Sequence, residues 1–414
     1  MSKKIKVGLV GCGRIMPIHL HGYKALMEKG FEVEIRALCD KHIENALRFR
    51  KRSEGSQPKD PVGPPGDPLH APHIYVSDFQ KSDIDIELYD NYKNMLKEAD
   101  IDAVDIYTSV DTHHFITIDS LYEDKHVMVE KPIAITVKAA RKMVEAAEKA
   151  KKVLGVGEGI HFIPGMRKTK WVIDQGCIGN IQLVFQAGLG GWWSPDKIVA
   201  ETPWRHLKLQ AGGGVTLDMG VHFLSLLRSY CGEVESVQGI VRIFEDTRVN
   251  RDKTGKIIQR IKSEVDDTFL AILKFKSGAL GQISYSWALH GPPIMMFPTI
   301  YGTKGSIKSN IVNLDDGTKT SVNQLFDENA SQGIKDKFFP YGLTDAAALE
   351  TLDFLNAILE GNEMEISGKE GLKDLAIAYA IIESSYLDRS VLVDDIEKGK
   401  TSFYENDINK HFDL

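Results

Sequence analysis

The chain has 414 residues, of which 43% are hydrophobic and 26% charged, and this balance excludes a disordered chain and favours two folded domains. Its 51 basic and 58 acidic side chains give a net charge of -7 without a basic block, which argues against nucleic acid as the main partner. Four scattered cysteines without a CxxC pair exclude a disulfide framework and a thiolate zinc site. The chain carries no signal-peptide pattern and no long apolar run, so we expect a soluble, cytoplasmic protein.

The first part of the chain alternates short apolar runs with helical stretches. We predict strands at 5–10, 33–39, 102–107, 126–130 and 152–158, and helices at 15–29, 41–52, 91–98, 113–123 and 136–151. This alternation predicts a Rossmann-type, doubly wound parallel sheet over residues 1–158. Residues 53–75 hold six of the fifteen prolines, so we interpret them as a surface insertion, with a functional lid as the less favoured alternative.

The second part changes to longer β-branched and aromatic segments. We predict strands at 181–190, 234–244, 266–275, 279–288 and 297–308, and helices at 344–360 and 370–387. Residues 159–414 are therefore expected to form an α+β domain with a large, mostly antiparallel open sheet. One apolar face of this sheet is expected to be uncovered and to form a homodimer or homotetramer.

A glycine-rich turn follows the first predicted strand, in the order Gly11, Cys12, Gly13, Arg14, Ile15, Met16. Glycines here let a pyrophosphate approach a helix N-terminus, although Met16 replaces the third glycine of the usual fingerprint. Asp40 closes the second strand, where a carboxylate can accept both ribose hydroxyls and repel a 2′-phosphate. The pattern therefore favours NAD over NADP, although Lys41 would soften the repulsion. Asp40 can also cap the following helix.

Two further motifs place acid–base groups near this turn. Lys131 follows the strand 126–130 in the sequence Glu130-Lys131-Pro132, where it can stabilise charge on a substrate oxygen. Three glycines at 212–214 precede Asp218 and His222, which are four residues apart and share a helical face. A carboxylate beside an imidazole can tune it as a general base. No further ligand lies at metal-binding spacing, so we predict no metal.

Three of the five tryptophans lie in a glycine-rich stretch, 188–204, before the three glycines: Trp192, Trp193 and Trp204. Aromatic faces stack on the apolar faces of sugars, so Trp192 and Trp193 are candidate substrate-binding residues. Core or interface packing is an equally weighted alternative.

Taken together, these motifs resemble the glucose-fructose oxidoreductase, inositol dehydrogenase and rhizopine-catabolism family of sugar and polyol dehydrogenases. The resemblance also includes residues 161–179 and Glu264 with Asp266 and Asp267, and covers most of the chain. It implies that Lys131 lies near the nicotinamide and the reacting hydroxyl, that His222 is the general acid/base, and that Asp218 binds substrate or relays a proton. It further implies cofactor contacts for these residues: Thr108, Ser109, His113, Glu130, Trp204 and Arg205.

Three positions depart from the family pattern. Ser109 replaces a proline, His161 stands where an arginine is common in the substrate site, and Ser225 stands where an aspartate is frequent. We therefore predict an NAD(P)-dependent oxidoreductase acting on a secondary hydroxyl of a sugar, sugar derivative or cyclic polyol. One alternative is a glycoside hydrolase that uses NAD for transient oxidation and elimination without net redox. The other is a non-catalytic NAD-binding regulator, which the presence of both Lys131 and His222 disfavours.

Overall fold

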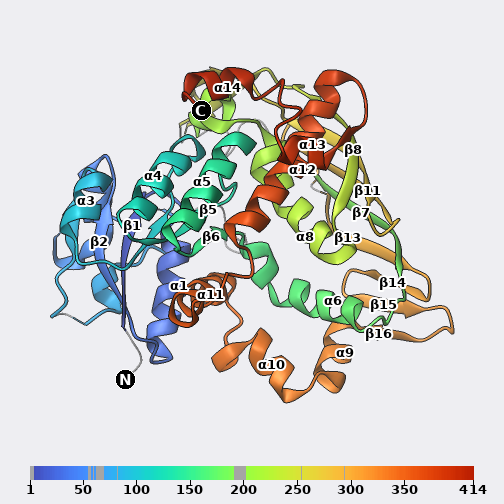
Figure 1. The fold of residues 1–414 in the computed structure, drawn as a ribbon, viewed down its shortest axis with the longest axis horizontal. Coiled ribbons are helices and arrows are strands. Elements are labelled where there is room, and N and C mark those ends of the chain that lie inside the picture. The colour runs from blue at the N-terminus through green and yellow to red at the C-terminus, as the bar shows by residue number, and fades with distance from the viewer. Residues whose placement is uncertain are drawn as a thin grey trace. The chain divides into compact units, whose positions relative to one another are not determined.

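The computed structural model describes residues 4–54, 57–58, 60–61, 70–81, 83–190, 202–252, 254–292 and 294–414. The chain divides into two compact units (Figure 1). The first contains Met1–Ala134, Ala139–Phe162 and Phe339–Gly371, and the second Ile135–Lys138, Ile163–Phe338 and Leu372–Leu414. The expected division at residue 158 thus differs from the observed one, because residues 159–162 and 339–371 belong to the first unit.

The first unit is built on a six-stranded parallel sheet in the order β3-β2-β1-β4-β5-β6. Its strands are β1 (Ile5–Val10), β2 (Val33–Cys39), β3 (Glu87–Tyr89), β4 (Ala103–Ile106), β5 (His126–Glu130) and β6 (Leu154–Gly157). Its helices are α1 (Met16–Glu28), α2 (Ile43–Arg50), α3 (Tyr92–Glu98), α4 (Val110–Tyr122), most of α5 (Val137–Ala150) and α11 (Ala346–Glu360). This strand order is that of a Rossmann fold, which confirms the predicted fold class.

Helix α11 joins this unit from far along the chain and lies beside α1 (Figure 1). Gly22 makes this approach possible, because a Cβ there would lie 2.9 Å from the backbone carbon of Ala347. Leu20 of α1 and Leu352 and Leu355 of α11 are fully buried in one core with the apolar residues of β1 and β2. The predicted domain boundary at residue 158 missed this packing, because the hydrophobic pattern of α11 does not indicate which sheet the helix covers.

The second unit is built on a nine-stranded sheet in the order β16-β15-β14-β13-β7-β12-β11-β8-β17. Its strands are β7 (Ile181–Leu189), β8 (Val234–Arg242), β11 (Thr268–Phe275), β12 (Leu280–Ser286), β13 (Ile294–Gly302), β14 (Gly305–Lys308), β15 (Ile311–Leu314), β16 (Lys319–Ser321) and β17 (Val391–Leu392). All neighbours are antiparallel except β7 and β12, as expected for a mostly antiparallel sheet. The expected strand 297–308 divides into β13 and β14 at Thr303 and Lys304.

Helices and a separate hairpin complete the second unit. The helices are α6 (Pro164–Asp174), α7 (Lys208–Ala211), α8 (Val221–Cys231), α9 (Val322–Asn329), α10 (Gln332–Phe338), most of α12 (Gly368–Leu387), α13 (Val393–Glu397) and α14 (Asn406–His411). The hairpin pairs β9 (Thr247–Arg251) with β10 (Ile257–Lys262). Among the described residues, no helix is long and apolar enough to span a membrane.

The two faces of the large sheet differ. Helix α12 packs directly on β8, where a Cβ at Gly239 would lie 2.7 Å from Ile381, and Phe269 and Leu273 of β11 are fully buried. The alternate positions on β8, β11 and β12 carry apolar side chains that are 49% to 58% exposed: Ile240, Leu270, Ile272 and Leu280. Strand alternation thus produces an apolar face, which we call the open face, that none of the described residues covers.

Candidate functional site

In the first unit, the predicted cofactor-binding residues gather at the carboxyl ends of the parallel strands. Gly11 follows β1, Asp40 follows β2, Thr108 comes shortly after β4, and Glu130 ends β5. The strand order reverses direction between β1 and β4, and ligands of open α/β sheets bind at such a switch point. Four segments that are distant in sequence therefore contribute to one edge of the sheet.

The turn after β1 requires glycine for two different reasons. Gly11 has a φ of 97°, and a Cβ there would lie 2.7 Å from the backbone carbon of Tyr107. At Gly13 no described heavy atom lies within 4 Å of the position a Cβ would take, so its backbone faces open space. Arg14 is exposed and Ile15 precedes α1, whereas Met16, at the place of the third glycine, is fully buried in the core.

The carboxylate of Asp40 is tied to this turn. Its Oδ2 accepts a hydrogen bond from the Cys12 N–H at 2.9 Å. Its Oδ1 accepts from the His42 N–H at 2.9 Å and from the Asn45 amide at 3.2 Å, just before and inside α2. Asp40 thus connects the glycine turn to the start of α2, the structural role considered for it alongside ribose binding.

His113 connects two further segments of this edge. Its side chain is buried, and its ring nitrogens lie 3.0 Å from the Pro132 carbonyl oxygen and 3.1 Å from that of Thr108. Burial lowers the pKa of His113, although its contacts with the Thr108 and Pro132 carbonyl oxygens oppose this. His113 therefore holds the segment after β5 against the loop after β4, where Ser109 precedes α4.

The end of β5 carries Glu130 and, after it, Lys131. The Glu130 Oε1 atom lies 2.8 Å from Nε2 of His19, a residue of α1 that the sequence motifs did not single out. Lys131 is half-buried and precedes Pro132. His161 is buried in a short 3₁₀ helix, Gly159–Phe162, of the same unit.

In the second unit, the Trp204–Arg205 pair meets Asp218. The Arg205 guanidinium lies 4.3 Å from the centre of the Trp204 ring, and its Nε donates to Asp218 Oδ2 at 3.3 Å. Asp218 belongs to a π-helical turn, Thr216–Gly220, and His222 lies in the first turn of α8 directly after it. The sequence motifs included Trp204, Arg205, Asp218 and His222. They did not predict the ion pair between Arg205 and Asp218.

Asp266 holds the turn that carries Asp218. Its Oδ1 accepts from the Gly214 N–H at 2.8 Å, and its Oδ2 accepts from the Thr216 N–H at 2.9 Å and from the Thr216 hydroxyl at 2.6 Å. The approach is so close that a Cβ at Gly214 would lie 1.6 Å from the Asp266 carbonyl oxygen. Glu264 fixes the preceding segment, because it accepts from the Lys208 N–H at 2.9 Å at the start of α7.

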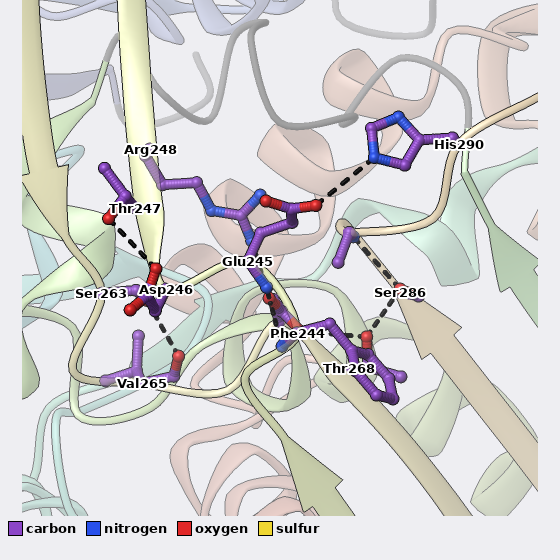
Figure 2. Close-up of polar contacts among 12 residues, drawn as sticks. Phe244, Glu245, Asp246, Thr247, Arg248, Ser263, Val265, Thr268, Ser286 and His290 are labelled. Atoms are coloured by element: carbon purple, nitrogen blue, oxygen red, sulfur yellow. Dashed lines mark hydrogen bonds and ion pairs between the residues drawn. The ribbon is translucent and has the colours of Figure 1, made fainter.

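Asp267 anchors the neighbouring loop in the same way. Its carboxylate accepts from the Phe244 and Glu245 N–H groups, at 3.0 and 2.8 Å, and pairs with the buried Arg248 at 3.1 Å. Figure 2 shows this loop, with Glu245 reaching toward His290. Glu264, Asp266 and Asp267 thus fix three separate segments from one short stretch before β11.

Two predicted substrate-binding residues, Trp192 and Trp193, lie outside the described residues, as does much of the 53–75 insertion. Ser225, where an aspartate is frequent in the family, is buried in α8. The residues that the structure describes contain no group of three or more histidine, cysteine or acidic side chains arranged to hold a metal ion. All four cysteines are free thiols.

Comparison with known proteins agrees with this architecture. Residues 5–158 match the family described as "Oxidoreductase family, NAD-binding Rossmann fold", and residues 166–308 match the GFO/IDH/MocA C-terminal domain. Myo-inositol 2-dehydrogenase of Thermotoga maritima is 25% identical over 95% of this chain and 99% of its own length. Levoglucosan dehydrogenase of Pseudarthrobacter phenanthrenivorans is 26% identical over 71% of this chain and 80% of its own length.

Solved structures show the same fold. Levoglucosan dehydrogenase in its apo form superposes with a TM-score of 0.73 at 22% identity, covering 94% of this chain and 98% of the other. Its complex with NADH superposes with a TM-score of 0.71 at 21% identity, covering 94% and 99%. The two matched domains together span well over half of the sequence, and the chain therefore belongs to the GFO/IDH/MocA family of NAD-binding oxidoreductases.

Proposed function

We propose that this oxidoreductase transfers a hydride between NAD and a secondary hydroxyl of a sugar, a sugar derivative or a cyclic polyol. The observation that carries the proposal is the turn held by Asp266, which presents Asp218 in an ion pair with Arg205 and leads directly into His222. Relatives named for levoglucosan and myo-inositol support the substrate class, because both molecules are cyclic and carry several secondary hydroxyls.

The glycine turn and Asp40 fit a bound dinucleotide. The open space at Gly13 leaves room for a pyrophosphate, and the Asp40 carboxylate at the end of β2 would accept the ribose hydroxyls. Bound NAD supplies the hydride acceptor. We propose that Asp40 favours NAD over NADP, because its charge would repel a 2′-phosphate.

We assign the proton chemistry to three side chains. His222 takes the proton from the substrate hydroxyl, as a neutral imidazole at the start of α8 can do. The Lys131 ammonium stabilises the negative charge that develops on the substrate oxygen. Asp218 hydrogen-bonds the substrate or relays the proton, and its pairing with Arg205 holds its carboxylate in one orientation.

The first experiment measures the absorbance of reduced nicotinamide in the purified protein with NAD or NADP and a panel of free sugars, inositols and glycosides. Reduced cofactor that accumulates with one class supports the dehydrogenase. Lys131→Ala and His222→Ala should abolish turnover while NADH binding persists. Lys125→Ala is the matched control, because Lys125 precedes β5 at its other end and donates to the Ile101 carbonyl.

Two outcomes would overturn the proposal in different ways. Release of the aglycone from a glycoside, with no net cofactor reduction, would identify the redox-neutral hydrolase. A regulator would bind NADH and turn over no substrate, and its NADH binding would be unchanged in Lys131→Ala.

We also propose that the open face forms a homodimer or homotetramer. Its exposed apolar side chains come from adjacent strands of one sheet, which is typical of a surface that another subunit covers. The four free thiols support the proposal of a reducing, cytoplasmic compartment.

A further inference from the structure

A buried polar pair lies behind the end of β5 in the first unit. His19 of α1 is buried with a side-chain exposure of 4%, and its ring stacks on Tyr107 with centroids 4.1 Å apart. Its Nε2 lies 2.8 Å from Glu130 Oε1, while Nδ1 has no hydrogen-bond partner among the described residues. Glu130 is 17% exposed, so its carboxylate lies at the boundary between the core and the carboxyl edge of the sheet.

The surroundings of His19 are acidic. Asp105 of β4 is fully buried, and its Oδ2 accepts from the Tyr107 hydroxyl and, at 3.2 Å, from the Tyr23 hydroxyl. Glu350 of α11 is buried close to Glu130, Asp105 and Glu158. Asp345, which caps α11, also acts on His19. The groups that act on the imidazole from the elements packed around it are therefore these carboxyls and the two tyrosines.

This environment determines where the protons reside. Burial alone would lower the pKa of His19, but the hydrogen bond and the charge of Glu130 outweigh it and raise the pKa above its usual value. Burial raises the pKa of Asp105 to about 7 and that of Glu350 well above its usual range. The acidic surroundings therefore favour the protonated form of His19, against the effect of burial.

We propose that protonated His19 is a positioning residue that fixes the Glu130 carboxylate at the carboxyl edge next to Lys131, and thereby couples the binding of NAD(H) to a buried proton. The geometry supports this directly. Glu130 is the last residue of β5, so its carboxylate lies at the carboxyl edge of the sheet. His19 contacts this carboxylate from the core. The stacked, buried ring of His19 has little freedom, and a charge-assisted hydrogen bond from it holds the carboxylate in one orientation. The proposal rests on the proposed function for the cofactor contact of Glu130 and for the role of Lys131.

The test measures the dissociation constant of NADH by fluorescence titration from about pH 5 to about pH 9, a range that includes the ordinary histidine pKa and extends further above it. In the wild type, affinity should be full at low pH and fall as the pH rises through the titration of His19. His19→Leu removes the donor that orients the Glu130 carboxylate and should weaken NADH binding by about tenfold at low pH, equivalent to about 1.4 kcal/mol. His19→Gln keeps a neutral donor near the position of Nε2, so its affinity should change much less with pH than that of the wild type.

A double-mutant cycle separates positioning from general packing. Glu130→Gln removes the partner charge, so adding His19→Leu to it should weaken binding much less than it does in the wild type. Equal NADH affinities for the wild type and His19→Leu at every pH would overturn the proposal, as would an equal loss in the Glu130→Gln background. If His19→Leu does not fold, the pH profile of His19→Gln decides alone, because a purely structural role would leave the wild-type slope in place. The readout is binding, so a failure to turn over any polyol would count against the proposed function and not against this pair.

Discussion

Removing the Asp266 carboxylate should loosen the turn that leads to Asp218 and His222. Asp266→Ala leaves the Gly214 and Thr216 N–H groups buried without an acceptor. Each unsatisfied buried donor costs about 1–3 kcal/mol, so the two together should lower the free energy of unfolding by about 2–6 kcal/mol. This loss is a large share of the roughly 5–15 kcal/mol that holds a typical folded domain together.

Asp266→Asn is the sharper variant. Its carbonyl oxygen can still accept from Gly214, and its amide can donate to the Thr216 hydroxyl, so only the Thr216 N–H loses its acceptor. We expect a loss of about 1–3 kcal/mol, toward the lower end. Burial raises the pKa of Asp266, although its hydrogen bonds from Thr216 and Gly214 oppose this, so removing the charge recovers part of that cost.

Urea unfolding measures the loss of stability, and the m-value should stay unchanged. Steady-state kinetics measure the effect on kcat and on the KM for NAD. We expect kcat to fall while the KM for NAD, which depends on the first unit, changes little. Asp174→Asn is the control, because Asp174 is exposed and its ion pair among the described residues is with Lys170 on α6, a surface pair worth less than about 1 kcal/mol. Wild-type stability and kcat in Asp266→Ala would refute the idea that this carboxylate holds the turn.

Three further predictions concern other parts of the molecule. Burial raises the pKa of Asp105 from 3.8 to about 7, so between these pH values the folded state keeps a proton that the unfolded state has released. The free energy of unfolding should therefore fall by up to about 4 kcal/mol as the pH rises from about 4 to about 7. Asp105→Asn should flatten this slope in urea unfolding, and an unchanged slope would assign it to another group. Asp40→Ser should lower the preference for NADH over NADPH in binding titrations by at least about tenfold, through lost repulsion; an unchanged ratio would contradict the role of the charge. Ile272→Lys on the open face should shift the sedimentation of the protein to a smaller species at unchanged thermal stability, whereas an unaltered assembly would place the interface elsewhere.

The sequence predicted the strands of the first unit well because each is an apolar run bounded by a turn. β1 and β5 match their predicted ranges, while β3 was missed because its three residues, Glu87–Tyr89, are only partly buried and carry no apolar run. The hairpin β9–β10 was missed for a related reason, since its residues are largely charged or polar. Short polar strands are stabilised by their neighbours in the sheet rather than by their own composition.

In the candidate site too, the sequence identified some residues and not the residues that hold them. Residues at strand ends and in spaced motifs, such as Asp40, Lys131 and Asp218, stand out in the sequence. The partners that hold them do not: His19 is 111 residues from Glu130, and Asp266 is 52 residues from Gly214. A lone histidine in a helix and an aspartate before a strand have many possible partners, and only the folded chain selects one.

The return of α11 to the first unit has a consequence for how this protein is made. The Rossmann sheet is complete at residue 157, yet the core that it shares with α11 needs residues up to 360. On the ribosome, the nascent sheet must therefore wait for roughly two hundred more residues, about ten to forty seconds at usual elongation rates, before Gly22 meets Ala347. During that interval the surface of α1 that α11 later covers has no partner, so the growing chain exposes this part of its nucleotide-binding half to chaperones until α11 has been translated.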